Sequence, residues 1–457
     1  MNDLAQNKMG TRPMFPLVMS MSLPAMFSMI IQALYNVVDS IFVARFSIKA
    51  LSAVSLAFPL QMILISFSVG TAVGVNSLIA RRLGAKNYAE ADAAATHGLF
   101  LSVCNYVLFL ILGLTISSRF IGLFTADDTI ITYGGQYLMI VMCLSIGMMI
   151  SVMGEKILQA TGNMIVPMLS QLLGAIVNII FDPLLIFGIG FFPRLGIVGA
   201  AVATVFGQFC SMAFLLFVLL HRKHEVKIRI RGFRPSGTIL KNIYIVGVPA
   251  IIMQSIGSVM VSGINAIIST ANVTVAVAEA YINSFGVYFK LQSFVFMPVF
   301  GLNQGVSPII GYNYGARNKR RMYQAFGIGL SVAAVIMIAG TALFQLAPAW
   351  LLSLFDADAL MLEVGVPTLR TISLSFILAS AGIMFSSLFQ AVGKGLYSMI
   401  MSLSRQLIVL LPVAYLLSRV SMSAMWYAFP IAEVASLIVA LVFFVILRNK
   451  ELRYLED

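Results

Sequence analysis

The sequence predicts an all-α integral membrane protein with twelve transmembrane helices in two homologous six-helix lobes. Hydrophobic residues make up 60% of its 457 residues, charged residues only 10%, and the mean hydropathy is +0.98. Apolar runs long enough to cross a bilayer recur along the whole chain, and its second half repeats its first. This composition excludes a soluble protein.

The predicted spans are apolar runs of about 20 residues or more. They cover residues 14–42, 51–80, 94–118, 130–155, 164–192, 196–220, 243–270, 276–310, 323–348, 361–391, 396–418 and 422–447. Pro24, Pro249, Pro298 and Pro367 interrupt these runs and predict helix breaks, because proline removes a backbone donor. The polar first twelve residues and the length of the first run indicate that no signal peptide is removed.

Basic residues are distributed unequally between alternate loops. With both termini in the cytoplasm, inside segments carry 21 of the 29 Lys and Arg residues, outside loops carry five, and three lie within spans. This bias predicts a multi-pass protein of the bacterial inner membrane with both termini cytoplasmic. Because the net charge of +12 comes from these short loops, we expect lipid as a partner and no nucleic acid.

The two halves align at a constant offset of 231 residues. This offset pairs Gly70, Gly74, Val75, Ile79, Gly84, Ala85 and Asn87 with Gly301, Gly305, Val306, Ile310, Gly315, Ala316 and Asn318. It predicts an N-terminal lobe (1–220), a cytoplasmic linker (221–242), a C-terminal lobe (243–447) and a cytoplasmic tail (448–457). Both lobes have the same orientation because six spans is an even number, and rocking of one against the other would give alternating access. A duplicated chain needs no second subunit to form a central path, so we expect a monomer.

Two carboxylates lie in apolar spans of the N-terminal lobe, Asp39 in the first and Asp182 in the fifth. Asn178 precedes Asp182 by one helical turn, and Thr204 follows in the sixth span. These hard oxygen ligands suit H⁺ or Na⁺, and Asp39, Asn178 and Asp182 would be the ligands if Na⁺ binds. Two plainer interpretations remain open: Asp39 reaches water or bonds a neighbouring helix, and Asp182 with Pro183 caps a helix break.

The C-terminal lobe lacks this pair. The offset places Val413 and Val409 at the positions of Asp182 and Asn178, and the match of Pro24 with Pro249 places Ile264 near that of Asp39. Ion coupling is therefore expected in the N-terminal lobe.

Further polar and aromatic residues within spans are candidates for the lining of a substrate cavity. They are Gln32, Tyr35, Asn36, Tyr281, Tyr288, Lys290, Asn303, Gln304 and Arg405. Lys290 has an alternative role in a structural pair with Glu279, and Arg405 has the same ambiguity. The sequence has no Walker motif, GxSxG or HExxH, so we expect neither an enzyme nor a cofactor.

Several motifs resemble those of the MATE family of multidrug and toxic compound extrusion transporters. They are Leu23-Pro24 with Val38-Asp39-Ser40, Gly84-Ala85-Lys86-Asn87, Gln159-Ala160-Thr161-Gly162-Asn163, Asn178-x3-Asp182-Pro183, Gly199-Ala200-Ala201-x-Ala203-Thr204 and Pro298-x-Phe300-Gly301-Leu302-Asn303-Gln304. The last, with Tyr312-Asn-Tyr-Gly-Ala-Arg317, looks most like the MepA-type branch. The resemblance implies a V-shaped antiporter that exports organic cations against H⁺ or Na⁺ and contributes to antibiotic resistance.

In DinF-like members of that family, an Asp of span 1, an Asn/Asp pair of span 5 and a Thr of span 6 form the cation site. The resemblance places them at Asp39, Asn178, Asp182 and Thr204. The Glu and Asp that NorM-like members carry in spans 7 and 10 have no counterpart here. Two alternatives stay open: a lipid-linked oligosaccharide or lipid flippase of the same superfamily, and a membrane-bound enzyme or receptor-like protein.

Overall fold

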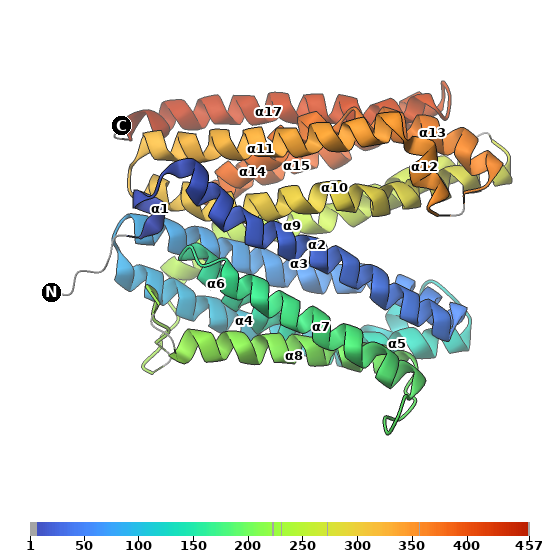
Figure 1. Ribbon diagram of the computed structural model, residues 1–457, viewed down its shortest axis with the longest axis horizontal. Helices are drawn as coiled ribbons and strands as arrows, with labels where there is room; N and C mark the ends of the chain where they lie inside the picture. The colour runs from blue at the N-terminus through green and yellow to red at the C-terminus, as the bar shows by residue number, and fades with distance from the viewer. Residues whose placement is uncertain (1–6, 222–223, 230, 272, 356, 456–457) are drawn as a thin grey trace.

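The computed structural model describes residues 7–221, 224–229, 231–271, 273–355 and 357–455, and all regular elements among them are helices. Parts of the predicted N-terminal lobe (1–6), linker (222, 223 and 230) and tail (456–457) lie outside the described residues. The N-terminal bundle follows a short helix, α1 (Lys8–Thr11) (Figure 1). Its helices are α2 (Met14–Phe46), α3 (Ile48–Gly84), α4 (Tyr88–Gly122), α5 (Asp128–Cys143), α6 (Ile146–Ala160), α7 (Ile165–Phe187) and α8 (Ile197–His221).

The C-terminal bundle repeats this succession. Its elements are α9 (Gly237–Ser269), α10 (Val275–Gly315), α11 (Lys319–Leu346), α12 (Pro348–Ser353), α13 (Ala359–Ser373), α14 (Phe376–Ala391), α15 (Gly395–Leu403), η1 (Ser404–Val409), α16 (Leu410–Ser418), η2 (Ala424–Tyr427), α17 (Ala428–Lys450) and η3 (Leu452–Tyr454). Because α9 begins at Gly237, the last residues of the predicted linker belong to a helix.

The described part of the chain holds ten to twelve candidate membrane spans. Ten helical segments are long and apolar enough to cross a bilayer singly, with residues 395–418 and 424–454 each counted as one segment. The pairs α5–α6 and α13–α14 are bent by 48° and 46° at a short break, and counting each pair as one span gives the predicted twelve. The predicted number of spans is therefore confirmed.

The breaks do not fall where proline predicted them. Pro24, Pro249, Pro298 and Pro367 all lie inside continuous helices. A proline removes only one backbone hydrogen bond, and close neighbours hold the helix together across the gap. Around Pro24, for example, the α2 backbone lies directly against Gly301 and Gly305 of α10.

The internal repeat is visible in the backbone conformation. Lys86 and Arg317, 231 residues apart, both have φ of 58°, which non-glycine residues seldom adopt. Gly162 and Gly393, at the same offset, have φ of 87° and 86°. At these two pairs of positions the halves have the same backbone conformation, as expected from the repeat.

The two bundles meet through a pseudo-symmetric pair of helix contacts: α3 packs against α9, and α2 packs against α10 (Figure 1). At their C-terminal ends, α3 and α10 touch through small residues. A Cβ atom on Gly84 would collide with the carbonyl of Tyr312, and one on Gly315 with the carbonyl of Arg81. Tyr312 follows Arg81 by the same 231 residues, so the two collisions are equivalent.

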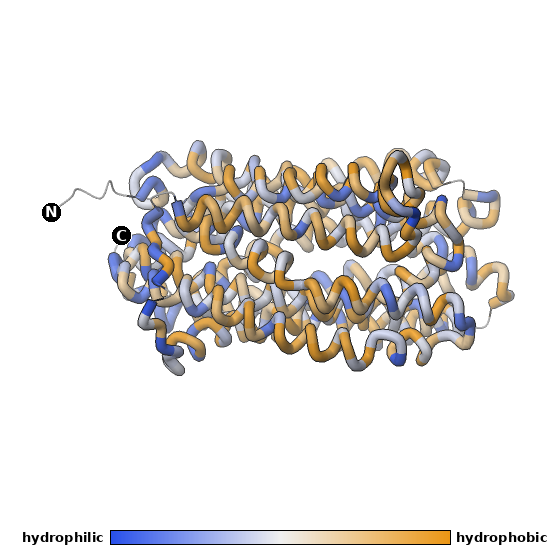
Figure 2. Tube along the Cα trace, turned by 90° about the horizontal axis from the view of Figure 1, so that it is seen from below, coloured by the Kyte–Doolittle hydropathy of each residue, from blue (hydrophilic) through white to orange (hydrophobic). Residues whose placement is uncertain are grey.

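Both chain ends lie at one end of the molecule, here called the terminal end (Figure 1). The bundles are joined there, and toward the far end α2 leaves α10 and runs along α7, as expected for a V-shaped arrangement. Figure 2 shows hydrophilic residues gathered at the ends, above all the terminal one, and hydrophobic residues between them. This distribution fits helices that cross a bilayer lengthwise.

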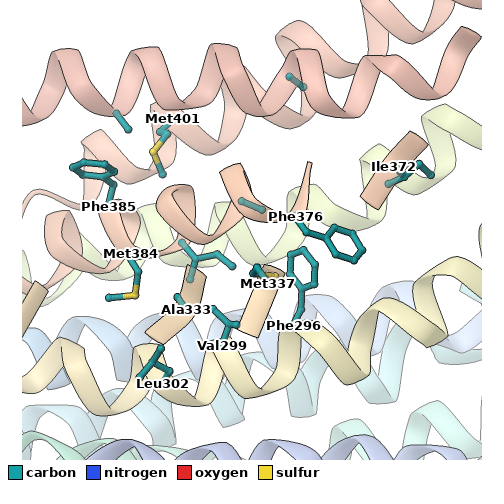
Figure 3. Packing of buried hydrophobic residues seen from close by; sticks show 14 of the residues in the cluster. Phe296, Val299, Leu302, Ala333, Met337, Ile372, Phe376, Met384, Phe385 and Met401 are labelled. Carbon is teal, nitrogen blue, oxygen red and sulfur yellow. The ribbon is translucent and has the colours of Figure 1, made fainter. Parts of the chain in front are cut away.

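The C-terminal bundle has a continuous apolar core (Figure 3). Phe296 of α10 meets Phe376 of α14 edge to face, with ring centroids 5.1 Å apart. Buried methionine, aliphatic and further aromatic side chains of α10, α11 and α14 surround them. Such packing makes the bundle a rigid unit.

The segment between the bundles is fixed to α4 in its described part. The backbone amide of Lys227 donates to Asp92 Oδ1 (2.7 Å), and that of Ser236 to His97 Nε2 (2.8 Å). Asp92 and His97 are both buried. The segment therefore packs along the terminal end of the N-terminal bundle.

Candidate ion and substrate sites

The far half of α2 brings Asp39 to Asp182 on α7. Their carboxyl groups lie within hydrogen-bonding reach of one another. Asp182 is fully buried, and Asn178 and Thr204 are 2% and 6% exposed. Helical spacing places Asn178 one turn before Asp182 on the same face, and α8 supplies Thr204. The structure thus brings together all four predicted ion-site residues.

The hydrogen bonds in this cluster leave several oxygens without a donor. Asn178 Nδ2 donates to Asp182 Oδ1 (3.4 Å) and to Thr204 Oγ1 (3.2 Å). Among the described residues, nothing donates to Asp39 Oδ1, Asp182 Oδ2 or Asn178 Oδ1, all of which are buried. Unpaired buried acceptors are costly, and a proton or a small hard cation between the two carboxylates would satisfy them.

Next to this cluster, the N-terminal bundle has an open cavity of about 170 Å³. Asn178 and Thr204 line it, together with Gln32 and Tyr35 of α2. The predicted Asn36 is exposed and is not among the lining residues. Its neighbour Tyr35 reaches toward Thr204 instead. Asn178 and Thr204 of the predicted ion site therefore also belong to the lining of the cavity.

Several polar residues around these sites were not predicted. Glu155 of α6, Gln171 of α7 and Gln208 of α8 line the cavity, and Tyr137 of α5 is buried close to Asp39. Glu155 is the last residue of the predicted span 130–155 and is followed by Lys156, so its position in the sequence is typical of a charged helix end. Gln171 and Gln208 carry a detectable signal, because each is a polar residue within a long apolar run.

The C-terminal bundle contains a second cavity, of about 210 Å³. Tyr288 and Arg405 line it, as predicted residues, beside several aromatic side chains. Arg405 Nη1 forms an ion pair with Glu433 Oε1 at 3.0 Å, so it is both a lining residue and half of a structural pair. Arg405 lies in the π-helical turn η1, a form often found at functional sites.

The remaining candidates lie outside both cavity linings. Tyr281 is buried beside Trp426, with ring centroids 6.2 Å apart. Lys290 is exposed and lies 5.7 Å from the ring centroid of Phe355. Its alternative pair with Glu279 does not form, because eleven residues of helix separate the two by about 16 Å.

Asn303 and Gln304 of α10 lie near the interface of the two bundles. Gln304 Oε1 accepts from Lys156 Nζ (2.9 Å) and from Gln159 Nε2 (3.2 Å), both on α6. Gln304 thus links the two bundles rather than lining a cavity. Asn303 is half-buried, and its Oδ1 has no donor among the described residues.

The MatE family pattern matches residues 24–184 and 279–416, which hold Asp39, Asn178, Asp182 and most of the second bundle. The chain belongs to the MatE family. Multidrug export protein MepA of Staphylococcus haemolyticus is 26% identical over 439 residues, covering 95% of this chain and 94% of that protein. The predicted family is therefore confirmed, and similarity to MepA extends over nearly the whole chain.

Solved structures agree with this assignment. An outward-facing multidrug resistance MATE family transporter of the MOP superfamily has a TM-score of 0.91 and 27% identity, covering 99% of this chain and all of that one. A MOP superfamily transporter from Pyrococcus furiosus, described as having a binding pocket of reverse polarity, gives the same values. This MatE protein is thus an integral membrane protein with the MATE transporter fold.

Proposed function

We propose that this MatE protein is a secondary active efflux transporter that exports organic cations or amphipathic compounds by H⁺ or Na⁺ antiport. The carboxylate pair of Asp39 and Asp182, with its unsatisfied buried oxygens, carries the proposal. A family whose members include multidrug export proteins supports the transport class. We place the protein in a bacterial inner membrane as a monomer with both termini in the cytoplasm.

The coupling ion would bind between Asp39 and Asp182. A carboxylate pair in an apolar span is costly while both groups are charged, so it favours capture of a cation. A proton needs only the two carboxyl oxygens, whereas Na⁺ would also use the free Oδ1 of Asn178. The ion is a transported substrate in either case, and the two choices predict different driving gradients.

Helix α2 connects the ion to the exported compound. Gln32 and Tyr35 line the cavity one to two turns before Asp39 on the same helix. An ion that pulls Asp39 toward Asp182 would therefore shift residues that contact the compound. Two ligands that favour different positions of one helix weaken each other's binding reciprocally, which is the thermodynamic basis of antiport.

The conformational change would follow from the position of α2. Its first half packs on α10 of the other bundle, and its second half lies along α7. A shift of this helix changes the contact between the bundles, which would rock to open the other side of the membrane.

Transport in proteoliposomes tests the proposal. Purified protein would take up a fluorescent organic cation under a pH gradient or a Na⁺ gradient, imposed separately. We expect one gradient to drive transport, and Asp39→Asn to lower the driven rate at least about tenfold, in the range of typical coupling free energies. Asp128→Asn is the matched control, because Asp128 is an exposed carboxylate at the start of α5.

Three results would contradict the proposal. If neither gradient drives transport, ion antiport is excluded. If Asp39→Asn transports at the full gradient-driven rate, the carboxylate pair has no part in the mechanism. An equal loss in Asp39→Asn and Asp128→Asn would show a general effect of charge. Size-exclusion profiles of both variants would show that each remains folded.

A further inference from the structure

The cavity of the N-terminal bundle has a second polar group nearer the terminal end. Glu155 is 7% exposed and lines the cavity from α6. Gln171, which binds it, precedes Asn178 by seven residues on α7, which is about 10 Å along the helix. This group is therefore separate from the pair of Asp39 and Asp182.

Glu155 lacks a cationic partner within the cavity. Gln171 Nε2 donates to Glu155 Oε2 at 2.8 Å. The adjacent Lys156 points elsewhere, since its Nζ donates to Gln159 (2.8 Å) and to Gln304 (2.9 Å). Among the described residues that line the cavity, none is Lys, Arg or His. No cation of the cavity lining therefore faces this carboxylate, and the charge of Lys156 acts on it from outside the lining.

Two further acceptors face the same space. Gln171 Oε1 and Gln208 Oε1 are buried, line the cavity and have no donor among the described residues. The orientation of the Gln171 amide is set by its bond to Glu155, so its oxygen is the free atom. One carboxylate and two carbonyl oxygens form a set of acceptors that lacks donors, and unpaired buried acceptors are costly.

We propose that Glu155, Gln171 and Gln208 form a recognition site for a protonated amine of the exported compound. Glu155 supplies the counter-charge, and the two amide oxygens accept N–H hydrogen bonds, so the site prefers an ammonium with N–H groups over a fully alkylated one. A buried site that hydrogen-bonds a ligand group rejects an analogue that lacks it. The inference rests on the proposed export function and adds the chemical class of the substrate.

A pair of matched probes tests this preference. One fluorophore would be prepared with a primary ammonium arm and with the corresponding trimethylammonium arm, and binding to purified protein in nanodiscs would be measured by fluorescence anisotropy. We expect the wild type to bind the ammonium probe more tightly. Glu155→Gln should weaken its binding about tenfold or more, the size of a charge-assisted contact.

Gln208→Met separates hydrogen bonding from charge, because methionine has a similar length without the oxygen. Gln208→Met should weaken binding of the ammonium probe several-fold and leave binding of the trimethylammonium probe unchanged. Glu363→Gln is the control, since Glu363 is an exposed carboxylate of α13. Should Glu155→Gln fail to fold, Gln208→Met alone decides whether the preference depends on this site.

Two results would overturn the inference: ammonium binding within twofold of wild type in both variants, or an equal weakening of both probes in Gln208→Met. The proteoliposome assay separates this failure from failure of the proposed function. If a gradient drives transport but the variants bind the probes as the wild type does, only the proposed recognition site is rejected. If probe binding changes in the variants but neither gradient drives transport, the recognition site is supported and the proposed antiport is rejected.

Discussion

At the scale of single residues, Gly84 determines how closely the bundles approach. A side chain there would meet the backbone carbonyl of Tyr312, which cannot rotate away. We expect Gly84→Ala to destabilise the protein by about 1–3 kcal/mol, the usual cost of overpacking. Thermal unfolding in detergent would show this as a lower midpoint.

Gly327→Ala provides the matched control. Gly327 lies in helix α11 and has open space where a Cβ would be placed. Alanine should stabilise the helix there by about 0.5–1 kcal/mol, because glycine loses more backbone freedom on folding. Equal changes in both variants would contradict the close approach at Gly84.

Glu155 and Lys156 show where residue-level prediction ended. Helical periodicity was sufficient to place Asn178 and Asp182 on one face, because it relates residues of the same helix. Glu155 and Lys156 are adjacent, so their side chains diverge by about 100° around α6. Which of them faced the cavity depended on the packing of α6 against α7 and α8, and the sequence of one helix does not contain that information.

At the scale of elements, helix α1 connects both bundles at the terminal end. Asn7, its N-cap, donates through Nδ2 to Glu225 Oε2 (2.6 Å) in the segment between the bundles. From the C-terminal bundle, Arg321 Nη2 donates to the carbonyls of Met9 (3.1 Å) and Arg12 (2.7 Å). Separation of the bundles at this end would break either the bond from Asn7 to Glu225 or the bonds from Arg321 to Met9 and Arg12.

This connection should depend on pH through Glu225. Burial raises the pKa of Glu225 above its usual 4.5, although the bond from Asn7 and the charge of Lys8 oppose the shift. A raised carboxyl pKa means that the protonated form favours the docked state, so its stabilisation is complete below pH 4.5 and is lost as pH rises through the folded pKa. Hydrogen exchange of α1, corrected for intrinsic rates, should therefore accelerate with rising pH.

Two variants check the origin of this effect. Glu225→Gln should make the protection of α1 independent of pH, and Asn7→Ala should lower the protection at every pH by removing the cap and the link. A pH dependence that persists in Glu225→Gln would assign it to another group.

The bent spans mark the limit of element-level prediction. Composition and run length were enough to locate twelve spans, because the cost of burying backbone in lipid fixes their length. Proline was a poor guide to breaks, since α2 passes Pro24 without interruption. The bends instead follow Cys143 and Ser373, which are 230 residues apart and so lie within one residue of equivalent places in the repeat.

At the scale of the whole molecule, the repeat was the strongest predictor. The constant offset predicted two equivalent lobes, and the matching backbone at Lys86 and Arg317 follows from it. It did not predict that α2 would pack on α10 and α3 on α9, because pairing across the pseudo-symmetry axis involves contacts between lobes and leaves no periodic pattern in either one.

The orientation of the whole molecule is the last prediction. Loops assigned to the inside carry 21 basic residues against five outside, and the structure gathers the chain ends at one end (Figure 1). Positive charge is retained on the cytoplasmic side during insertion, so the terminal end should face the cytoplasm. Phe191, 90% exposed in the loop between α7 and α8, should then lie outside.

Cysteine labelling would establish this orientation. Starting from a variant without Cys104, Cys143 and Cys210, Phe191→Cys and Ala316→Cys would each be treated with a membrane-impermeant maleimide on spheroplasts. Ala316 is exposed at the turn between α10 and α11. We expect Phe191→Cys to react at once and Ala316→Cys only after permeabilisation. The reverse pattern would place the terminal end outside, and Asp39 and Asp182 would then lie nearer the cytoplasm, which would reverse the side from which the coupling ion enters.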